Sequence, residues 1–523
     1  MNLDSVHADA RAGNAARLHD ETARHHGDAT AIEYHGTTLT HDDLREESAR
    51  FAGGLADRGV EPGDVMLQYL PNCPAYLIGA LGAFKAGVVV SPVNPQYRRR
   101  ELAYQLEDTD ATVVLTHAAL LEHLQEGLEE IDWDPLVIAV GSTDEGVEMF
   151  SDVRGEERFV ERDDDDVALL PYTSGTTGKP KGVQLTHRNF RAQMFSILSQ
   201  PSDLADEDVR SLVWLPLYHI TGFTHTAWQP LLRGGRVYLR SAANWDGDAA
   251  MELMEKAEIT HFVGVTAMYV DMVNSEHFGE YDLSSLETAG EGGAKMSVAV
   301  QERFEEVAGV DMGEGYGLTE THGATHSQSN STFGLRHGTI GQPTRQTDCK
   351  IVDESGDEVD PGEEGELLVR GPQVMTGYHD MPEATAAAFT ENGYFRTGDI
   401  ARRDADNYYE IVDRKKHMIN TAGYNVYPSE LEELLAEHEA VAESAVVGIP
   451  DERRNEVPKA FVVPAPGVEP GEDVTAEAIT EYVLERVAAY KHPREVEFID
   501  ELPRTTSGKI QKYKLEERTD DEG

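Results

Sequence analysis

Two residue types are scarce in this chain of 523 residues, and each scarcity narrows the classes of protein that fit. The two cysteines, Cys73 and Cys349, are far apart and lack the spacing of metal ligands, which excludes a disulfide-stapled secreted domain and a zinc module. We predict that both are reduced thiols in a cytoplasmic protein. Lysine occurs only 13 times, so a stretch that contains several lysines is a candidate for function.

Positive charge is scarce overall. The chain has 45 Lys and Arg against 96 Asp and Glu, which gives a formal net charge of −51. Such a charge repels itself in dilute buffer, whereas in about 1 M salt the screening length falls to about 3 Å. The composition therefore predicts a halophilic protein of a salt-accumulating cytoplasm. It argues against nucleic acid or an anionic membrane as a partner.

Long apolar runs are missing as well. The most apolar stretch, residues 75–90, contains Lys85 and is shorter than the roughly 20 residues that a membrane-spanning helix needs. Residues 1–11 are polar and acidic, without a signal-peptide pattern. We therefore expect no membrane span. At about 150 residues per structural unit, the length predicts roughly three units.

The first part of the chain alternates short apolar runs with stretches of helical periodicity. This alternation indicates crossover units and a parallel sheet. Thr40 and Asp43 have the spacing of a helix-starting pair. The expected strands are 65–70, 88–90 and 112–115, and the expected helices are 75–86, 99–107 and 186–200.

The segment Tyr172–Gly182 reads Tyr-Thr-Ser-Gly-Thr-Thr-Gly-Lys-Pro-Lys-Gly and follows a short apolar run. Its glycines let backbone N–H groups approach an anion, its hydroxyls add donors, and Lys179 and Lys181 add positive charge. The spacing differs from the loop of kinases and GTPases, because only two residues separate Gly175 from Gly178 and a proline follows the lysine. We interpret the segment as a phosphate-binding loop of another type.

Four further segments carry polar or glycine-rich sequence. His219 follows the apolar run 213–217, and the end of a strand in an open α/β sheet commonly borders a pocket. The turn at 288–295 is rich in glycine. The segment 315–320 combines a tyrosine, a hydroxyl and a carboxylate, and a carboxylate near phosphates suits Mg²⁺. Asp399 stands on a turn in the fourth segment. A structural role, in which Asp simply stabilises the turn, explains this residue as well as a functional role does.

The pattern changes to antiparallel alternation at residues 365–370. The charged segment Asp413–Lys416 lacks apolar periodicity and is our candidate linker between domains. Beyond it we predict a helix that Ser429 caps, strands over 441–449, 460–463 and 496–499, and a helix over 476–489. These elements describe a small α+β domain.

Together these motifs resemble the adenylate-forming superfamily of acyl-CoA synthetases, luciferases and nonribosomal-peptide adenylation domains. The resemblance extends over about residues 15–515 and rests on Tyr172–Gly182, Tyr316–Glu320, Thr397–Asp399, Arg414 and Ser507–Lys509. It implies an α/β fold whose large N-terminal domain, 1–413, combines parallel-sheet subdomains with a β-rich segment. A small mobile α+β C-terminal domain, 414–523, would follow.

The resemblance also implies a two-step reaction that uses ATP, Mg²⁺ and CoA. The carboxylate of an acid first joins the α-phosphate of ATP and releases pyrophosphate, and the CoA thiol then displaces AMP from the acyl-adenylate. Thr319 would contact the α-phosphate, and Glu320 with Thr173 would bind Mg²⁺. The nucleotide site would comprise Thr173, Ser174, Gly175, Thr176, Thr177, Gly178, Lys179, Gly290, Glu291, Gly292, Tyr316, Asp399 and Arg414.

Within that set, Tyr316 would stack on adenine, and Asp399 with Arg414 would hold the ribose region. Lys509 would bridge the carboxylate and the α-phosphate in the first step. Because Lys509 belongs to the small domain, this domain would move before CoA enters. The family hinge falls on Lys416.

Two further groups of residues are implied. Gly423 and Tyr424 would face the CoA channel, and the acyl pocket would include His219, Phe223, Gly264 and His322, with His219 also counted as catalytic. Tyr-His at 218–219 stands where amino-acid-activating relatives have an Asp that binds the substrate amine, which disfavours peptide synthesis.

The resulting prediction is an AMP-forming acyl-CoA synthetase for a medium- or long-chain fatty acid, with an aryl acid as the alternative. A luciferase-type oxidation remains open in principle, because the motifs of the first step are shared across the superfamily. A catalytically inert acyl- or nucleotide-binding relative is disfavoured, because the functional residues are all present. A homodimer is compatible with the sequence, which does not define an oligomeric state.

Overall fold

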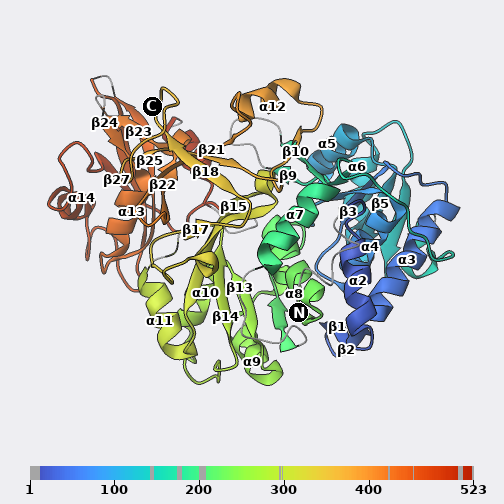
Figure 1. Cartoon of the computed structure of the whole chain (residues 1–523). Helices are drawn as coiled ribbons and strands as arrows, with labels where there is room; N and C mark the ends of the chain where they lie inside the picture. The colour runs from blue at the N-terminus through green and yellow to red at the C-terminus, as the bar shows by residue number, and fades with distance from the viewer. Residues whose placement is uncertain are drawn as a thin grey trace. The chain divides into compact units, whose positions relative to one another are not determined.

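The computed structural model describes residues 12–141, 146–173, 180–199, 208–293, 296, 298–421, 424–451, 453–504 and 510–520. The chain divides into two compact units. Unit 1 is Met1–Asp348 with Arg370–Phe395, and unit 2 is Cys349–Val369 with Arg396–Gly523. Their elements are labelled in Figure 1. This division follows from which residues contact one another. The predicted boundary between residues 413 and 414 instead separates a domain that moves from one that does not, and it stays a prediction.

Unit 1 contains a large sheet, which we call sheet A, whose centre is parallel. Strands β1, β12, β11, β13, β14 and β15 all run in the same direction. The predicted parallel sheet is therefore confirmed. In spatial order its described strands are β17 (Gln342–Pro343), β16 (Gly323–Ser327), β15 (Met312–Leu318), β14 (Thr288–Gly292), β13 (His261–Gly264), β11 (Arg210–Val213), β12 (Arg236–Leu239), β1 (Thr30–Tyr34) and β2 (Thr37–Thr40).

A second sheet of unit 1, sheet B, is parallel from β8 to β7 and antiparallel at its other end. Strand β9 (Tyr172–Thr173) pairs with β10 beside the main path. The remaining described strands are β20 (Gly377–Tyr378), β10 (Lys181–Thr186), β8 (Val167–Leu169), β4 (Val89–Pro92), β3 (Val65–Tyr69), β5 (Val113–His117), β6 (Leu136–Val140) and β7 (Glu148–Met149).

Helices cover both sheets and bury apolar side chains against them. The sheet A core places Met254, Tyr269 and Phe304 of the helices against Phe262 and Met312 of the strands. The helices are α2 (Arg17–His26), α3 (His41–Asp57), α4 (Pro74–Ala86), α5 (Arg99–Thr109), α6 (Leu121–Leu128), α7 (His187–Leu198), α8 (Gln229–Arg233), α9 (Gly247–Ala257), α10 (Thr266–Asn274), α11 (Val298–Ala308) and α12 (Pro382–Ala388).

Local sequence explains where two of these helices begin. Thr40 and Asp43 form the reciprocal cap of α3, as the spacing predicts. Thr186 caps α7 in the same way through Asn189. No helix in the described part of the chain is long and apolar enough to cross a membrane.

The described residues of unit 2 form mainly two sheets and three helices. The first sheet runs β18 (Asp348–Val352), β19 (Gly365–Arg370), β21 (Phe395–Arg403) and β22 (Tyr409–Arg414). The second, sheet F, runs β24 (Tyr424–Val426), β23 (Ile419–Thr421), β26 (Asn455–Pro464) and β25 (Val441–Asp451), with β27 (Glu495–Phe498) parallel to β26. The helices are α13 (Pro428–Ala436), α14 (Ala476–Leu484) and α15 (Lys512–Asp520).

Sheet F carries apolar side chains on both faces. Val446 and Val462 pack with α13 and α14, whereas Ala445 and Phe461 pack with Leu515 of α15. Because neighbouring residues of a strand point to opposite faces, helices cover both sides. The predicted α/β fold with a small α+β C-terminal part is confirmed.

Two details of the helix predictions are wrong. Helix α13 begins at Pro428, whose fixed φ suits the first helical position, and Ser429 already lies inside it. The Ser429 hydroxyl instead donates to Asp413 Oδ2 at 2.9 Å. Helix α14 ends at Leu484, earlier than the predicted residue 489.

Candidate active site

Several predicted site residues of unit 1 lie at or just beyond the carboxyl ends of the parallel strands of sheet A. Gly292 ends β14, Gly290 lies two residues earlier in that strand, and a Cβ built on Gly292 would lie 3.9 Å from the Thr221 methyl group. The segment after β11 therefore meets the end of β14, as expected at the carboxyl edge of such a sheet. Glu291 is buried and accepts a hydrogen bond from Thr266 Oγ1 at 3.1 Å.

The end of β15 carries the next group. Tyr316 is half-buried and packs edge-on against His326, with ring centroids 5.9 Å apart. Thr319 and Glu320 then form a short 3₁₀ turn, η6 (Thr319–Thr321). Glu320 Oε1 accepts a hydrogen bond from the Tyr378 hydroxyl at 3.0 Å. This contact holds the predicted metal ligand in one orientation.

Tyr378 is a residue that sequence reasoning missed. It lies on β20, which pairs with β10, and the ammonium of Lys181 stands 4.7 Å from the centre of its ring. Burial and the Glu320 carboxylate both raise the pKa of Tyr378, so its hydroxyl remains a proton donor. No sequence signal links Tyr378 to Glu320, because the two segments meet only in the fold, where the Met375 N–H donates to the Glu320 carbonyl at 2.8 Å and β20 pairs with β10.

The residues present fit a magnesium ion. Thr173 pairs with Lys181 between β9 and β10, Lys181 lies against the ring of Tyr378, and Tyr378 donates to Glu320. These contacts connect the two predicted metal ligands, Thr173 and Glu320. Within the described residues, no three His, Cys, Asp or Glu side chains form a metal cluster. Mg²⁺ in phosphate sites is commonly held by one or two carboxylates and by the phosphates themselves. Glu320, with one oxygen bonded to Tyr378, keeps acceptor capacity for that purpose.

In unit 2, the structure brings Asp399 and Arg414 together. They stand opposite each other on β21 and β22, and Arg414 Nε lies 2.6 Å from Asp399 Oδ1. The preceding Gly398 has φ of +69°, which favours glycine. The Asp399 N–H donates to Thr397 Oγ1 at 3.1 Å. The side chain of Asp399 is only 2% exposed, so it is fixed in place.

Lys416 lies in η8 (Lys415–His417), a single turn between β22 and β23. Loss of water around its ammonium, and then the charge of Arg414, lower the pKa of Lys416 to about 8 although the side chain as a whole is exposed. A short connection between two sheets suits a hinge, and the hinge role stays a prediction.

Eight predicted residues lie outside the described part of the chain. They are Ser174, Gly175, Thr176, Thr177, Gly178, Lys179, Gly423 and Lys509. Their roles stay predictions. His219 is described and is exposed, and its backbone carbonyl accepts from the Phe223 N–H at 3.0 Å.

The other acyl-pocket candidates are buried. Phe223 lies in a π-helical segment, η4 (Gly222–Trp228), and Gly264 packs on the rings of Tyr269 and Phe262. His322 ends η6 in the left-handed region, with φ of 54°. Sequence reasoning missed Tyr76, Phe190 and Trp228, which surround Phe223. A π-helical turn often marks a functional site, but it has no sequence signature.

Residues 19–379 match the AMP-binding enzyme family, and residues 430–509 match the AMP-binding enzyme C-terminal domain. The chain belongs to the AMP-binding enzyme family. A feruloyl-CoA synthase of an Amycolatopsis species is 37% identical to it, over 94% of this chain and 96% of that protein. A long-chain-fatty-acid–CoA ligase of Bacillus subtilis (strain 168) is 34% identical, over 96% of this chain and 94% of that protein.

The solved structure of the anthranilate CoA ligase AuaEII with anthranoyl-AMP has a TM-score of 0.89 to this fold, with 27% identity and 97% of each chain covered. The predicted superfamily and enzyme class are confirmed: this member of the family is an AMP-forming acid–CoA ligase. Its co-substrates are a carboxylic acid, ATP and CoA, and its metal is Mg²⁺.

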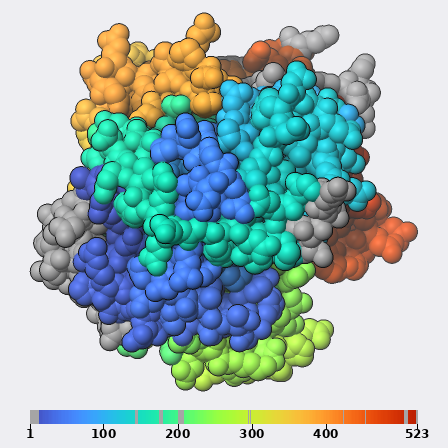
Figure 2. All heavy atoms as spheres, turned by 90° about the vertical axis from the view of Figure 1, so that its right-hand side faces the viewer, coloured from blue at the N-terminus to red at the C-terminus, as the bar shows by residue number. Residues whose placement is uncertain are grey.

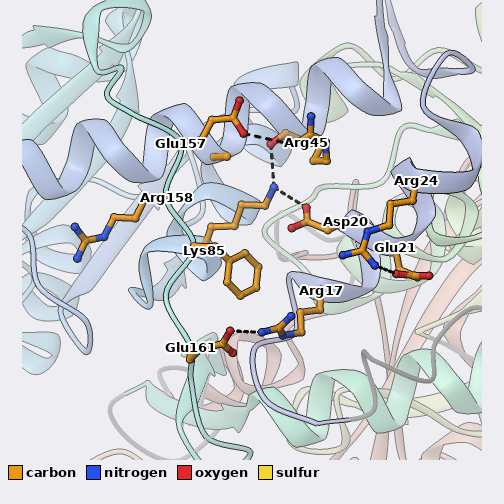
Figure 3. Close-up of a pocket in the computed structure, with 11 residues that line it drawn as sticks. Arg17, Asp20, Glu21, Arg24, Arg45, Lys85, Glu157, Arg158 and Glu161 are labelled. Carbon is orange, nitrogen blue, oxygen red and sulfur yellow. Dashed lines mark hydrogen bonds and ion pairs between the residues drawn. The ribbon is translucent and has the colours of Figure 1, made fainter.

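The enzyme also has a charged hollow of about 430 Å³ that contains none of the predicted site residues. It lies in unit 1 among α2, α3, α4 and the segment 157–161. Figure 2 shows the face of the molecule that carries the blue and cyan segments of unit 1. As Figure 3 shows, the buried ammonium of Lys85 meets Asp20 at 2.7 Å and the Arg45 carbonyl at 2.9 Å. Burial lowers the pKa of Lys85, and the Asp20 charge opposes that shift. We interpret this network as a link between helices.

Proposed function

We propose that the residues described above carry out the two chemical steps of this ligase. In the first step, a carboxylate oxygen of the acid bonds to the α-phosphorus of ATP, and the bond from that phosphorus to pyrophosphate breaks. In the second, the CoA sulfur bonds to the acyl carbon, AMP leaves, and the thiol proton passes to water. The observation that carries the proposal is the convergence of β14, β15 and the Glu320–Tyr378 pair at one edge of sheet A.

Charge explains the roles in unit 1. Two anions must meet in the first step, so cations and hydrogen-bond donors have to offset their repulsion. Lys181, Thr319 and Glu320 would serve the phosphates, Glu320 by holding Mg²⁺ whose charge polarises the phosphoryl oxygens. The loop residues 174–179 would supply further donors, as the sequence predicts.

Residues of unit 2 would bind the ribose of ATP, and the segment of unit 2 that carries Lys509 would move between the two steps. Asp399 has two carboxylate oxygens, and its pairing with Arg414 supports a rigid acceptor for the ribose hydroxyls. Lys509 would supply the cation of the first step. The segment 414–523 would then turn about Lys416 before the second step.

Tyr424 supports a place for the nucleotide part of CoA in unit 2. Its side chain is 57% exposed and stacks on Tyr490, with ring centroids 4.6 Å apart. Three arginines stand directly before strands of the same sheet, Arg453 and Arg454 before β26 and Arg494 before β27, and we call them the arginine turn. Burial and then the charge of Arg454 lower the pKa of Arg494, so these two guanidinium groups are close to each other, and the Asp451 carboxylate opposes the shift.

The strand pairing places the arginine turn beside the tyrosines. Thr421 of β23 pairs with Asn455 of β26, which directly follows Arg454, and Arg494 Nη2 donates to the Ala489 carbonyl at 3.0 Å beside Tyr490. A cluster of cations is unusual in a chain with a net charge of −51. Adenine would stack on Tyr424, and the phosphates of CoA would meet the arginines.

We propose two alternative classes of carboxylic acid as the substrate. A medium- or long-chain fatty acid is our expectation from the sequence, and long-chain-fatty-acid–CoA ligases are relatives at 34% identity. An aryl acid is the alternative, and feruloyl-CoA synthase is a relative at 37% identity.

ATP–pyrophosphate exchange and AMP release test the proposal. Purified enzyme should exchange labelled pyrophosphate into ATP only when an acid is present, and should release AMP with acyl-CoA when CoA is added. Formation of ADP and orthophosphate instead would overturn the scheme. The assay should use a panel of acids from acetate to palmitate, together with benzoate and cinnamate.

The cellular setting is also a proposal. We place the enzyme in a salt-rich cytoplasm because its charge of −51 requires screening, and we propose a homodimer, to be checked by light scattering. Activity and the unfolding temperature should both rise with KCl toward molar concentration. Full activity and stability in millimolar salt would contradict the halophilic assignment.

A further inference from the structure

Helix α5 of unit 1 is hydrogen-bonded to both arms of the segment Tyr172–Gly182 (Figure 1). The Tyr172 hydroxyl, in β9, donates to Asp108 Oδ2 at 2.5 Å. The Tyr104 hydroxyl donates to the carbonyl of Pro180, the residue directly before β10, at 2.7 Å. The helix therefore accepts a hydrogen bond from one arm and donates one to the other.

Tyr104 and Asp108 lie on one face of a helix whose opposite face is anchored in the core. They are four residues apart, so their side chains are neighbours on the helix surface. Both are half-buried. Leu102 and Leu106, on the opposite face, are fully buried against the strands of sheet B. The helix is therefore a fixed base for the two polar side chains.

The ring of Tyr172 is held from two sides. It packs edge-on against the ring of Tyr104, with centroids 6.2 Å apart. Tyr172 also pairs with Gly182 across the hairpin, and a Cβ built on Gly182 would lie 3.1 Å from Tyr172 Cζ. A side chain at position 182 would press on the ring. Glycine at the end of the segment therefore leaves the room in which the Tyr172 hydroxyl reaches Asp108.

The two bonded residues adjoin residues that have been assigned to the phosphate end of ATP. Thr173, a predicted Mg²⁺ ligand, directly follows Tyr172, and Lys181, which would serve the phosphates, directly follows Pro180. Thr173 and Lys181 also pair with each other between β9 and β10. Each bond from α5 therefore fixes the backbone one residue away from a side chain that would meet the metal or the phosphates.

The bond to Asp108 is the stronger constraint. A hydroxyl that donates to an ionised carboxylate lies about 2.5–2.7 Å from its acceptor, and such a bond is roughly twice as strong as one between neutral groups. The Tyr172–Asp108 distance lies within this range. Tyr104 bonds a neutral carbonyl, so we expect its loss to have a smaller effect.

We propose that Tyr104 and Asp108 are positioning residues for the phosphate end of ATP. Asp108 acts through Tyr172 on Thr173, and Tyr104 acts through the Pro180 carbonyl on Lys181. The inference rests on the proposed function, which places these two side chains at the metal and the phosphates.

A comparison of ATP with AMP separates positioning from a merely structural role. AMP lacks the β- and γ-phosphates, but it shares the adenine, ribose and α-phosphate with ATP. Residues that only stabilise the fold would weaken the binding of both nucleotides equally. Residues that position the phosphate contacts weaken the binding of ATP more than the binding of AMP.

The first experiment measures the Kd for ATP and for AMP by calorimetry, with the full chain and Mg²⁺ in high salt. Asp108→Ala should raise the Kd for ATP about 10-fold, the lower end of the range for residues that orient metal ligands. Asp108→Asn should raise it less, because the amide oxygen still accepts. Tyr104→Phe should raise it about 3-fold. The Kd for AMP should stay within about 2-fold in all three variants.

A double mutant tests whether Asp108 acts through Tyr172. Tyr172→Phe removes the donor of the bond, so Asp108→Ala should have little further effect on the Kd for ATP in that background. Effects that add in full would contradict the route through Tyr172. Tyr104→Phe removes a single oxygen atom and keeps the ring contact, so it decides the inference even if Asp108→Ala does not fold.

Kinetics give a second readout. In ATP–pyrophosphate exchange with the fastest acid of the panel, the variants should raise KM for ATP and leave KM for the acid unchanged. Thioester formation from supplied acyl-adenylate should be retained, because this intermediate has no β- or γ-phosphate. An equal loss of both half-reactions would contradict the positioning role.

Two control variants remove similar bonds elsewhere in unit 1. The Tyr69 hydroxyl of β3 donates to the Tyr97 carbonyl at 2.8 Å, and Asp271 of α10 accepts from the Trp245 indole at 2.8 Å. Tyr69→Phe and Asp271→Ala should leave the ratio of the two Kd values unchanged. A change in this ratio as large as in the α5 variants would contradict the assignment.

The wild type separates the inference from the proposed function. If no acid of the panel supports exchange, the proposed function fails and the inference fails with it. If the wild type exchanges pyrophosphate and the α5 variants keep the wild-type ratio of Kd for ATP to Kd for AMP, the inference alone is overturned.

Discussion

In unit 1, the residues beside the proposed acid pocket are buried, aromatic and uncharged, whereas in unit 2 the exposed residues proposed to meet CoA are cationic. His322 shows the first condition, since burial holds it neutral. Arg453 and Arg454 show the second, since both are exposed directly before β26, the strand that pairs with β23. The acid would be recognised by shape in a low-dielectric site, and the nucleotides by charge. The two regions should therefore respond differently to mutation, salt and pH.

Loss of the Lys509 side chain should have the largest effect on the reaction rate, and it is the strongest test of whether the two regions serve different steps. We expect Lys509→Ala to lower acid-dependent pyrophosphate exchange by about 10²- to 10³-fold, because one preorganised donor of the first step is lost. Thioester formation from supplied acyl-adenylate should be retained. Lys514→Ala, an exposed lysine of α15, is the control. Equal loss of both half-reactions would argue against a role confined to the first step.

Asp399 tests whether a charged pair in unit 2 serves ATP. Asp399→Asn keeps the shape but weakens the bond to Arg414, so KM for ATP should rise about 10- to 100-fold, as for a charge-assisted hydrogen bond worth roughly 1.5–3 kcal/mol. Steady-state kinetics against ATP measure it. Glu410→Gln removes an exposed ion pair with Arg402 on the same two strands and should change KM little. Similar KM values in both variants would contradict the ribose role.

Substitution of an arginine in the arginine turn should have a smaller effect, limited to the KM for CoA. Arg454→Gln should raise KM for CoA about 5-fold, the size expected when an exposed charge pair of about 1 kcal/mol is lost. The variant should also discriminate less between CoA and 3′-dephospho-CoA, and pyrophosphate exchange should not change. Arg486→Gln, an exposed arginine over the ring of Tyr482, is the control. A parallel change in the exchange rate would show that Arg454 acts elsewhere.

A buried histidine of unit 1 should give the smallest effect, visible only with pH. Burial lowers the pKa of His41 to about 4 from 6.5. The unfolded chain therefore takes up the proton first, and stability is full above pH 6.5 and lost as pH falls from 6.5 toward 4. For this group the loss is about 1 kcal/mol at pH 6 and grows at lower pH.

The corresponding variant is His41→Gln. Its free energy of unfolding should fall less between pH 8 and pH 6 than that of the wild type, measured by denaturant titration in high salt. His277→Gln, at an exposed histidine, should follow the wild type. Identical slopes for all three proteins would contradict the assignment and would weaken the contrast between neutral unit 1 and charged unit 2.

Several features could be predicted from residue spacing because the physics behind them is local. The Thr40–Asp43 cap and the alternation of strands and helices depend on neighbours a few residues away. The motifs also indicated the family and the two-step reaction before any fold was known. The start of α13 was misjudged because Asp413, sixteen residues earlier, binds Ser429 and removes it from the capping role.

The amino-acid sequence by itself determined the chemistry, because each phosphate, ribose or metal contact needs a particular residue type within a short motif. Only the tertiary structure decided which groups meet across long intervals: Tyr378 on Glu320, Arg414 on Asp399, and the rings of Tyr76, Phe190 and Trp228 around Phe223. Such contacts come from sheet pairing and packing between elements far apart in the chain, and their apolar members carry no motif because many similar side chains could fill the same space.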